Sequence, residues 1–199
     1  FFNPRNFPIA IHAAAGEYYL NRVGDRSDLW QVYVDYVKGG GFLIACGNTS
    51  QFFYAGTAAA DGRWQQRYDP GQMVATELGL KVVNGPIPNS KKMFLRSLPG
   101  QAIASFSSPM PLEYLNWKSY RGVDSNGTFQ TEFVPLAEVC DEQGRAFKGY
   151  PIALMRYGSR QLNGAEMIWI WGELLNDERS HTLLDQAVKY GLKRLPGRF

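Results

Sequence analysis

Cysteine and histidine are scarce in this 199-residue sequence, which contains two of each. The two cysteines, Cys46 and Cys140, form neither a disulfide framework nor the spacing of a zinc site. Whether they are free or paired is not indicated by the sequence. A P-loop and a dinucleotide fingerprint are also missing, because the glycines of "GGGF" at 39–42 lead into a strand and not into a helix. We therefore predict no metal and no cofactor.

Charge of one sign is also not concentrated anywhere in the chain. The sequence has 21 basic and 18 acidic residues, a net charge of +3, and no basic run. This pattern argues against a nucleic-acid partner. No apolar run is long enough for a transmembrane helix, so no membrane span is expected. Glycosylation-type triplets at Asn48 and Asn126 slightly favour a secreted or cell-envelope location over a cytoplasmic one.

Apolar and aromatic residues are plentiful. They make up 45% and 14% of the chain, and charged residues account for 20%. This composition is typical of a globular domain with a real core and excludes a disordered chain. We predict a single domain over residues 1–199, in which 84–126 is an irregular insertion rich in Pro, Ser and Gly.

Strands and helices alternate along the predicted chain. The segment "DRSDLWQVYVDYVK" has helical spacing, and Gly39–Gly41 end that helix. The next residues, "FLIAC", form an apolar run without alternation, as expected for a strand covered on both faces. Further strands are expected in 9–14, 131–140, 150–158 and 165–172, and an amphipathic helix in 176–196. Such alternation favours an α/β fold with a parallel sheet.

Cys46 stands at the end of a predicted buried strand. In open α/β sheets, ligands bind at the carboxyl ends of strands, so this position draws attention. It has two interpretations. Cys46 is either a nucleophile, or a small buried residue that fills the same place.

Two stretches carry a resemblance to a known family. The order of a strand, Gly16, a helix, "YVKGGG" and "FLIACG" resembles the class I glutamine amidotransferase-like superfamily. The later stretch "FVPLAEVCDEQGRAFKGYPIALMRYG", followed by "AEMIWIWGE", is similar to its non-catalytic branches. These include domains attached to β-galactosidases, trehalose-utilisation-like proteins, and the domain like the biotin-protein-ligase amino terminus. The resemblance implies a flavodoxin-like three-layer sandwich with a mostly parallel sheet, whose first strands are missing from this sequence.

The residues depart from the catalytic form of that superfamily. The nucleophile elbow around Cys46 lacks the glycines two before and two after the cysteine. Trp171 stands where the resemblance implies the catalytic histidine, with Glu173 at the acid position. Without a base to take its proton, a cysteine stays mostly a thiol at neutral pH. His181 is the one histidine considered as a substitute base. His12 is interpreted as a core or sheet-end residue.

A second group of residues is a candidate for ligand binding. Glu17 and Asn48 follow strands predicted to end at the same edge as Cys46, and Glu173 follows another. Trp64 and Trp117 lie in loop-like sequence and could face a sugar or a partner. The alternatives are glutamates that cap helices or pair with arginines, and tryptophans that pack in the core.

These observations favour a non-catalytic domain that serves binding or assembly within a larger, carbohydrate-handling protein. Its expected partners are another domain or chain, a second copy of itself, or a small polar or sugar ligand. The alternative is a hydrolase that uses Cys46 or the carboxylates of Glu17 and Glu173. Whether the chain is an enzyme is left open, with the incomplete triad arguing against it.

Overall fold

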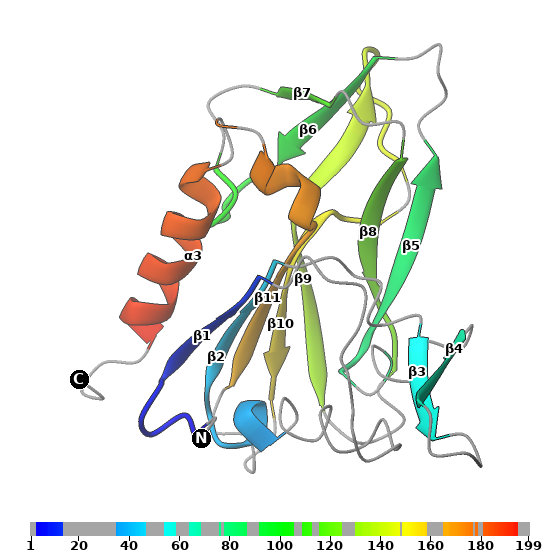
Figure 1. Ribbon diagram of the computed structural model, residues 1–199. Helices are drawn as coiled ribbons and strands as arrows, with labels where there is room; N and C mark the ends of the chain where they lie inside the picture. Colours follow the sequence, from blue (N-terminus) through cyan, green and yellow to red (C-terminus); the bar gives the residue numbers. More distant parts are fainter. Residues whose placement is uncertain are drawn as a thin grey trace.

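The structure is a computed structural model, and it describes most of the chain (Figure 1). The described residues are 3–13, 35–46, 54–58, 64–68, 76, 78–86, 92–105, 109–112, 116–124, 130–147, 149–158, 165–176, 178 and 181–194. All statements below concern these residues.

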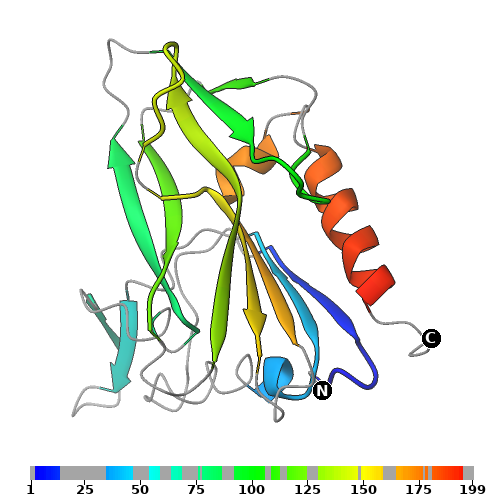
Figure 2. The same cartoon turned by 180° about the vertical axis from the view of Figure 1, so that it is seen from behind.

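The centre of the molecule is a seven-stranded mixed sheet with the order β1-β2-β11-β10-β9-β6-β7. It curls from the blue strand β1 to the green strand β7, as Figure 2 shows from behind. Its strands are β1 (Ile9–His12), β2 (Phe42–Ala45), β6 (Met93–Ser97), β7 (Met110–Leu112), β9 (Thr131–Asp141), β10 (Ile152–Tyr157) and β11 (Glu166–Ile170). Two further pairs form separate two-stranded antiparallel sheets: β3 (Tyr54–Ala58) with β4 (Trp64–Tyr68), and β5 (Leu80–Pro86) with β8 (Asn116–Gly122).

The pairing of these strands contradicts the expected fold class. Only β1 with β2 and β2 with β11 are parallel. The other four neighbours in the sheet pair antiparallel. The described part of the chain is mostly β, so the prediction of a flavodoxin-like, three-layer α/β sandwich with a mostly parallel sheet is wrong. The predicted strands within 150–158 and 165–172 do exist, but they form an antiparallel pair.

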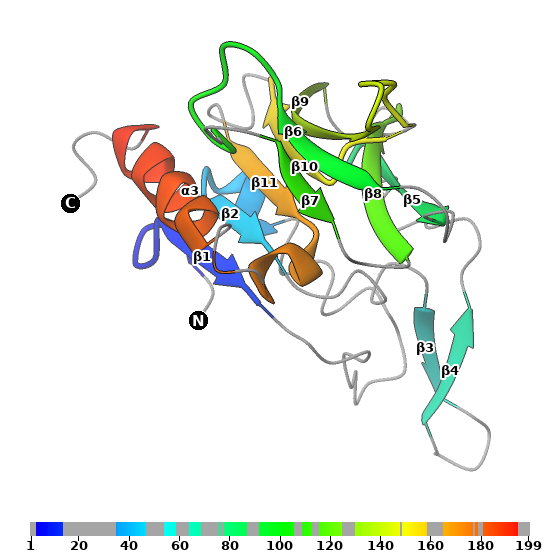
Figure 3. The ribbon, with the colours of Figure 1, turned by 90° about the horizontal axis from the view of Figure 1, so that it is seen from above.

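The sheet is nevertheless covered on both faces (Figure 3). Helix α3 (His181–Arg194) packs on one face, where Leu183 and Ala187 join Phe42 and Ile44 in one apolar cluster. The ribbon of β5 and β8 covers the other face, where Leu80, Val82 and Tyr120 join Leu43 and Ala45 in a second cluster. Consecutive side chains of β2 therefore enter opposite cores, which explains why "FLIA" has no polar alternation.

Two glycines lie where a residue with a side chain would not fit. One ends a helix and the other lets a helix pack closely on the sheet. Residues 35–38 are helical, and Gly40 follows with φ of 84°, a left-handed conformation that ends a helix at little cost. On α3, a Cβ at Gly191 would lie 2.6 Å from Phe42 Cδ1 and 3.1 Å from Ile9 Cδ1. Only a residue without a side chain lets α3 approach β1 and β2 this closely.

The range 84–126, expected as an irregular insertion, contains strands. It holds the end of β5 and all of β6, β7 and β8. β9 connects this part to the rest because its first half pairs with β10 and its last residues pair with β6. The register between β9 and β10 shifts near Pro135, where a proline cannot donate a ladder hydrogen bond.

Candidate functional site

Cys46 directly follows β2, at the carboxyl end of the parallel strands. Its side chain is only 4% exposed and belongs to the apolar cluster beneath α3. The thiol donates a weak hydrogen bond to the carbonyl oxygen of His12, with Sγ and O 3.5 Å apart. The backbone N–H of Cys46 donates to the same oxygen at 2.9 Å. A carbonyl oxygen does not remove a proton, so this contact holds the thiol in place without activating it.

The electrostatic surroundings also favour the thiol over the thiolate. Burial raises the pKa of Cys46, and a backbone hydrogen bond offsets this only in part. The thiolate is the nucleophilic form of cysteine. Burial therefore makes Cys46 less reactive than an ordinary cysteine at neutral pH.

Trp171 occupies the place where the resemblance implied a catalytic histidine. It follows β11, is 4% exposed, and lies in the same apolar cluster as Cys46. Its backbone N–H donates to the carbonyl oxygen of Pro151 at 2.9 Å. An indole can donate a hydrogen bond but cannot act as a base. At this position the chain thus has apolar packing in place of acid–base chemistry.

The other candidate residues are spread over the molecule or fall outside the described part. Glu173 lies in the 3-10 helix η2 (Gly172–Asn176), and His181 is the exposed first residue of α3. Trp64 begins β4 and Trp117 lies in β8, whereas both were expected in loops. The structure describes the backbone of Glu173, Trp64 and Trp117 but not their side chains. Glu17 and Asn48 lie entirely outside the described part. The grouping of Glu17, Cys46, Asn48 and Glu173 stays a prediction.

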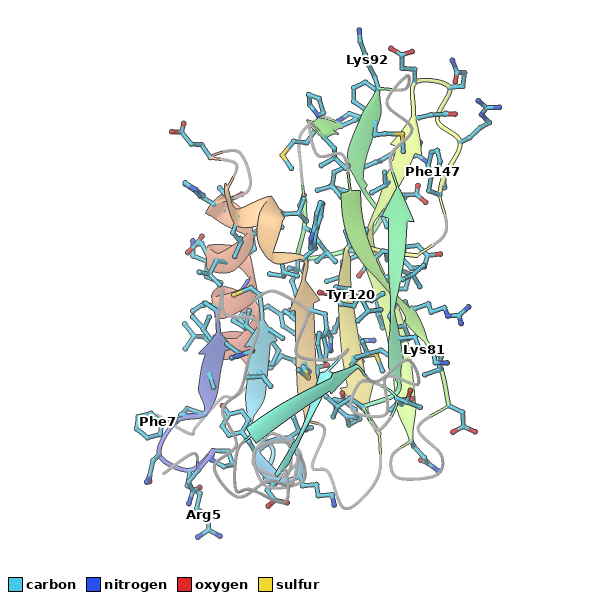
Figure 4. The ribbon with its side chains drawn as sticks, turned by 45° about the vertical axis from the view of Figure 1, so that its right-hand side comes forward. Arg5, Phe7, Lys81, Lys92, Tyr120 and Phe147 are labelled. Carbon is cyan, nitrogen blue, oxygen red and sulfur yellow. The ribbon has the colours of Figure 1, made fainter. Side chains whose placement is uncertain are left out.

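Two other side chains flank the end of β2. His12 and Trp169 are the register partners of Ala45 on its two sides. The ring of Tyr120, from β8, contacts Trp169 with centroids 5.5 Å apart. The hydroxyl group of Tyr120 is buried and has no hydrogen-bond partner among the described residues (Figure 4). Sequence analysis missed Tyr120, because it lies in the range that gave no readable pattern.

Few large apolar side chains are exposed among the described residues. Three large apolar side chains are exposed: Phe7 by 54%, Ile11 by 48% and Leu192 by 46%. Phe7 precedes β1, Ile11 lies within it, and Leu192 follows the glycine of α3 that packs on Ile9.

Metal-ligand clusters and membrane-spanning helices are both absent from the described part of the chain. No group of three or more His, Cys, Asp or Glu side chains is placed to hold a metal ion. Among the described helices, none combines the length and apolar character needed to cross a membrane.

Comparison with known proteins gives one likeness of fold. No family model matches the sequence, and no curated protein sequence matches it. The fold is similar to the crystal structure of a cold-adapted β-galactosidase from Rahnella sp. R3, with a TM-score of 0.53 and 12% sequence identity. The likeness covers 94% of this chain but only 23% of that chain, so this chain spans about a quarter of the length of the β-galactosidase. At this identity, the likeness concerns the fold alone.

Proposed function

We propose that this chain is a non-catalytic domain that serves binding or assembly within a larger, carbohydrate-handling protein. In this proposal it is similar to the domains attached to β-galactosidases in the glutamine amidotransferase-like superfamily. The observation that carries the proposal is the state of Cys46, a buried thiol that bonds to a carbonyl oxygen.

Two further observations support this function. The fold resembles about a quarter of a β-galactosidase chain, which is the size expected of one domain in a larger protein. Trp171 lies in the same apolar cluster as Cys46, where its indole cannot act as the base that a thiol nucleophile needs.

The rate of iodoacetamide alkylation tests the non-catalytic part of the proposal. We would measure Cys46 in the Cys140→Ser variant, and Cys140 in the Cys46→Ser variant, from about pH 6 to pH 10. Both side chains are buried and burial raises both pKa values, so each is the control for the other. We expect slow labelling of both in the folded protein and fast labelling of both in denaturant.

Fast alkylation of Cys46 would have the opposite meaning. Fast labelling of Cys46 alone, with a midpoint well below the ordinary thiol value of about 8.5, would mean an activated thiolate. That result would overturn the proposal and favour a hydrolase that uses Cys46.

A further inference from the structure

Residues 98–105 follow β6 and form neither helix nor strand, yet they complete part of the core. We call them the covering segment. Two of them, Ile103 and Ala104, are at most 1% exposed and belong to the apolar cluster that also contains Leu183 and Ala187 of α3. Figures 1 and 2 show the covering segment as a green coil that leaves the end of β6 and passes beside α3. The core on this face of the sheet therefore depends in part on a segment without secondary structure of its own.

The backbone of the covering segment has an unfavourable conformation. Ala104 has φ of 59°, and among the described residues it is the one residue other than glycine with a positive φ. The Cβ atom makes this left-handed conformation sterically costly. In addition, the buried backbone groups of Ile103 and Ala104 make no hydrogen bond to a described residue, which raises the free energy of the closed position. The apolar packing of Ile103 and Ala104 has to offset both effects.

One side chain of α3 fastens the end of the covering segment. The Oε1 atom of Gln186 accepts a hydrogen bond from the N–H of Ser105 at 3.2 Å, and its Nε2 donates to the carbonyl oxygen of Ser105 at 3.3 Å. At the other end, the N–H of Leu98 donates to the carbonyl oxygen of Leu136 on β9 at 3.0 Å. These are the hydrogen bonds that join the segment to other described residues. Because Ser105 is exposed, water can replace the bonds to Gln186 there.

We propose that the covering segment is a two-state element with Gln186 as its clasp, which opens while the sheet and α3 stay folded and so uncovers the apolar cluster beneath Ile103 and Ala104. Segments with few hydrogen bonds and a strained backbone open at a lower free energy than the core of a protein. In the open state Ala104 leaves its left-handed conformation, and the backbone groups of Ile103 and Ala104 bond to water. The opening would add a conformational step to the proposed function without depending on it.

Hydrogen exchange followed by NMR on the ¹⁵N-labelled chain tests this opening. The amides of Ile103, Ala104 and Ser105 are compared with that of Leu154, which lies in β10 between two paired strands. We expect protection of the three amides to be measurable but at least about tenfold lower than that of Leu154. Their exchange rates should stay constant in urea up to about 1 M, because a local opening exposes little surface, whereas the exchange of Leu154 should accelerate.

Two variants with a matched control test the clasp and the strain. Gln186→Met keeps a long side chain but removes both hydrogen bonds to Ser105, so it should accelerate the urea-independent exchange of Ser105 at least about threefold. Lys189→Met, on the same helix, breaks only an exposed ion pair with Asp185 and should leave that rate unchanged. Ala104→Gly relieves the left-handed conformation and should slow the exchange of Ser105 about threefold.

Three results would overturn the inference. The amides of the covering segment could exchange with the rate and urea dependence of Leu154, so that the segment opens only when the whole protein unfolds. They could instead show no protection at all, so that no closed state exists in solution. Finally, Gln186→Met could leave the exchange of Ser105 unchanged, so that Gln186 is not the clasp. None of these results depends on the alkylation of Cys46, so the proposed non-catalytic function is tested separately.

Discussion

Tyr120 and Tyr157 are both fully buried, but their hydroxyl groups differ in their surroundings. The hydroxyl of Tyr157 donates to the carbonyl oxygen of Leu78 at 3.1 Å. The hydroxyl of Tyr120 has no hydrogen-bond partner among the described residues. A buried polar group without a partner costs about 1–3 kcal/mol, whereas a satisfied one contributes about 1 kcal/mol. The two residues should therefore respond in opposite ways to the loss of their oxygen.

We predict that Tyr120→Phe raises the free energy of unfolding by about 1 kcal/mol, because it deletes an unsatisfied group and keeps the ring against Trp169. Tyr157→Phe, the matched control, should lower it by about 1 kcal/mol because it removes the bond to Leu78. Urea unfolding of the wild type and both variants measures the two changes. Equal losses in both would mean that Tyr120 has a partner, such as an internal water, that supports its hydroxyl.

At the level of single residues, the sequence could predict burial better than contact. Cys46 was expected at the end of a buried strand, and it does follow the buried strand β2. Its burial agrees with one of the two interpretations that the sequence left open, that of a small residue packed in the core. Local apolar runs carry that information. The contact between Tyr120 and Trp169 joins residues 49 positions apart on strands of different sheets, and no local pattern encodes such a pairing.

Among the elements, α3 and β11 are linked by a carboxylate that is buried in the fold. Glu166, at the start of β11, is 3% exposed. Its oxygens accept hydrogen bonds from Arg156 Nε at 3.2 Å, Tyr190 Oη at 3.1 Å and Arg194 Nε at 3.0 Å. Tyr190 and Arg194 belong to α3, so this carboxylate fastens the end of the helix to the sheet.

We predict that Glu166→Gln lowers the free energy of unfolding by about 2 kcal/mol. Removing one member of a buried ion pair typically costs about 3–5 kcal/mol, and the partial exposure of both arginines reduces this value. The control is Asp185→Asn, which breaks the exposed pair with Lys189 and should cost less than about 0.5 kcal/mol. Denaturant titration measures both variants. A similar loss of stability in both variants would mean that the buried carboxylate of Glu166 stabilises the fold no more than the exposed ion pair of Asp185 does.

The elements themselves were largely legible from the sequence. The spacing of apolar residues predicted the strands that became β2, β10 and β11, and it predicted helix α3. β6, β7 and β8 were missed because they are short and separated by Pro, Ser and Gly, which break the pattern that identifies a strand. This range contains only short apolar runs such as "KMFLRSL", which overlaps β6.

At the scale of the whole molecule, the layers and the strand directions could not be predicted. A strand buried on both faces is apolar throughout, whether its neighbours run parallel or antiparallel. In this protein a β ribbon covers the face where the flavodoxin-like arrangement would place helices, and Leu80, Val82 and Tyr120 make that face as apolar as a helix would. The directions of the strands and the nature of the layers depend on contacts between residues that are distant in sequence. This explains why individual strands were predicted correctly but the fold class was not.

The pH dependence of folding belongs to the whole molecule, and the burial of His12 contributes to it near neutrality. Burial lowers the pKa of His12 below its usual value of 6.5. Between the two values, the unfolded chain binds the proton more readily than the folded one, so lowering the pH favours unfolding. Stability from this residue is complete above about pH 6.5 and is lost as the pH falls below it. Asp141 acts in a separate, more acidic window: burial opposes the effect, but hydrogen bonds from Arg145 hold its pKa below 3.8.

We predict that the free energy of unfolding of the wild type falls as the pH is lowered from about 7 to 5, and that His12→Gln falls less steeply. Urea titrations at several pH values, with ionic strength held constant, measure both slopes. Parallel slopes in the two proteins would mean that another group causes the acid sensitivity.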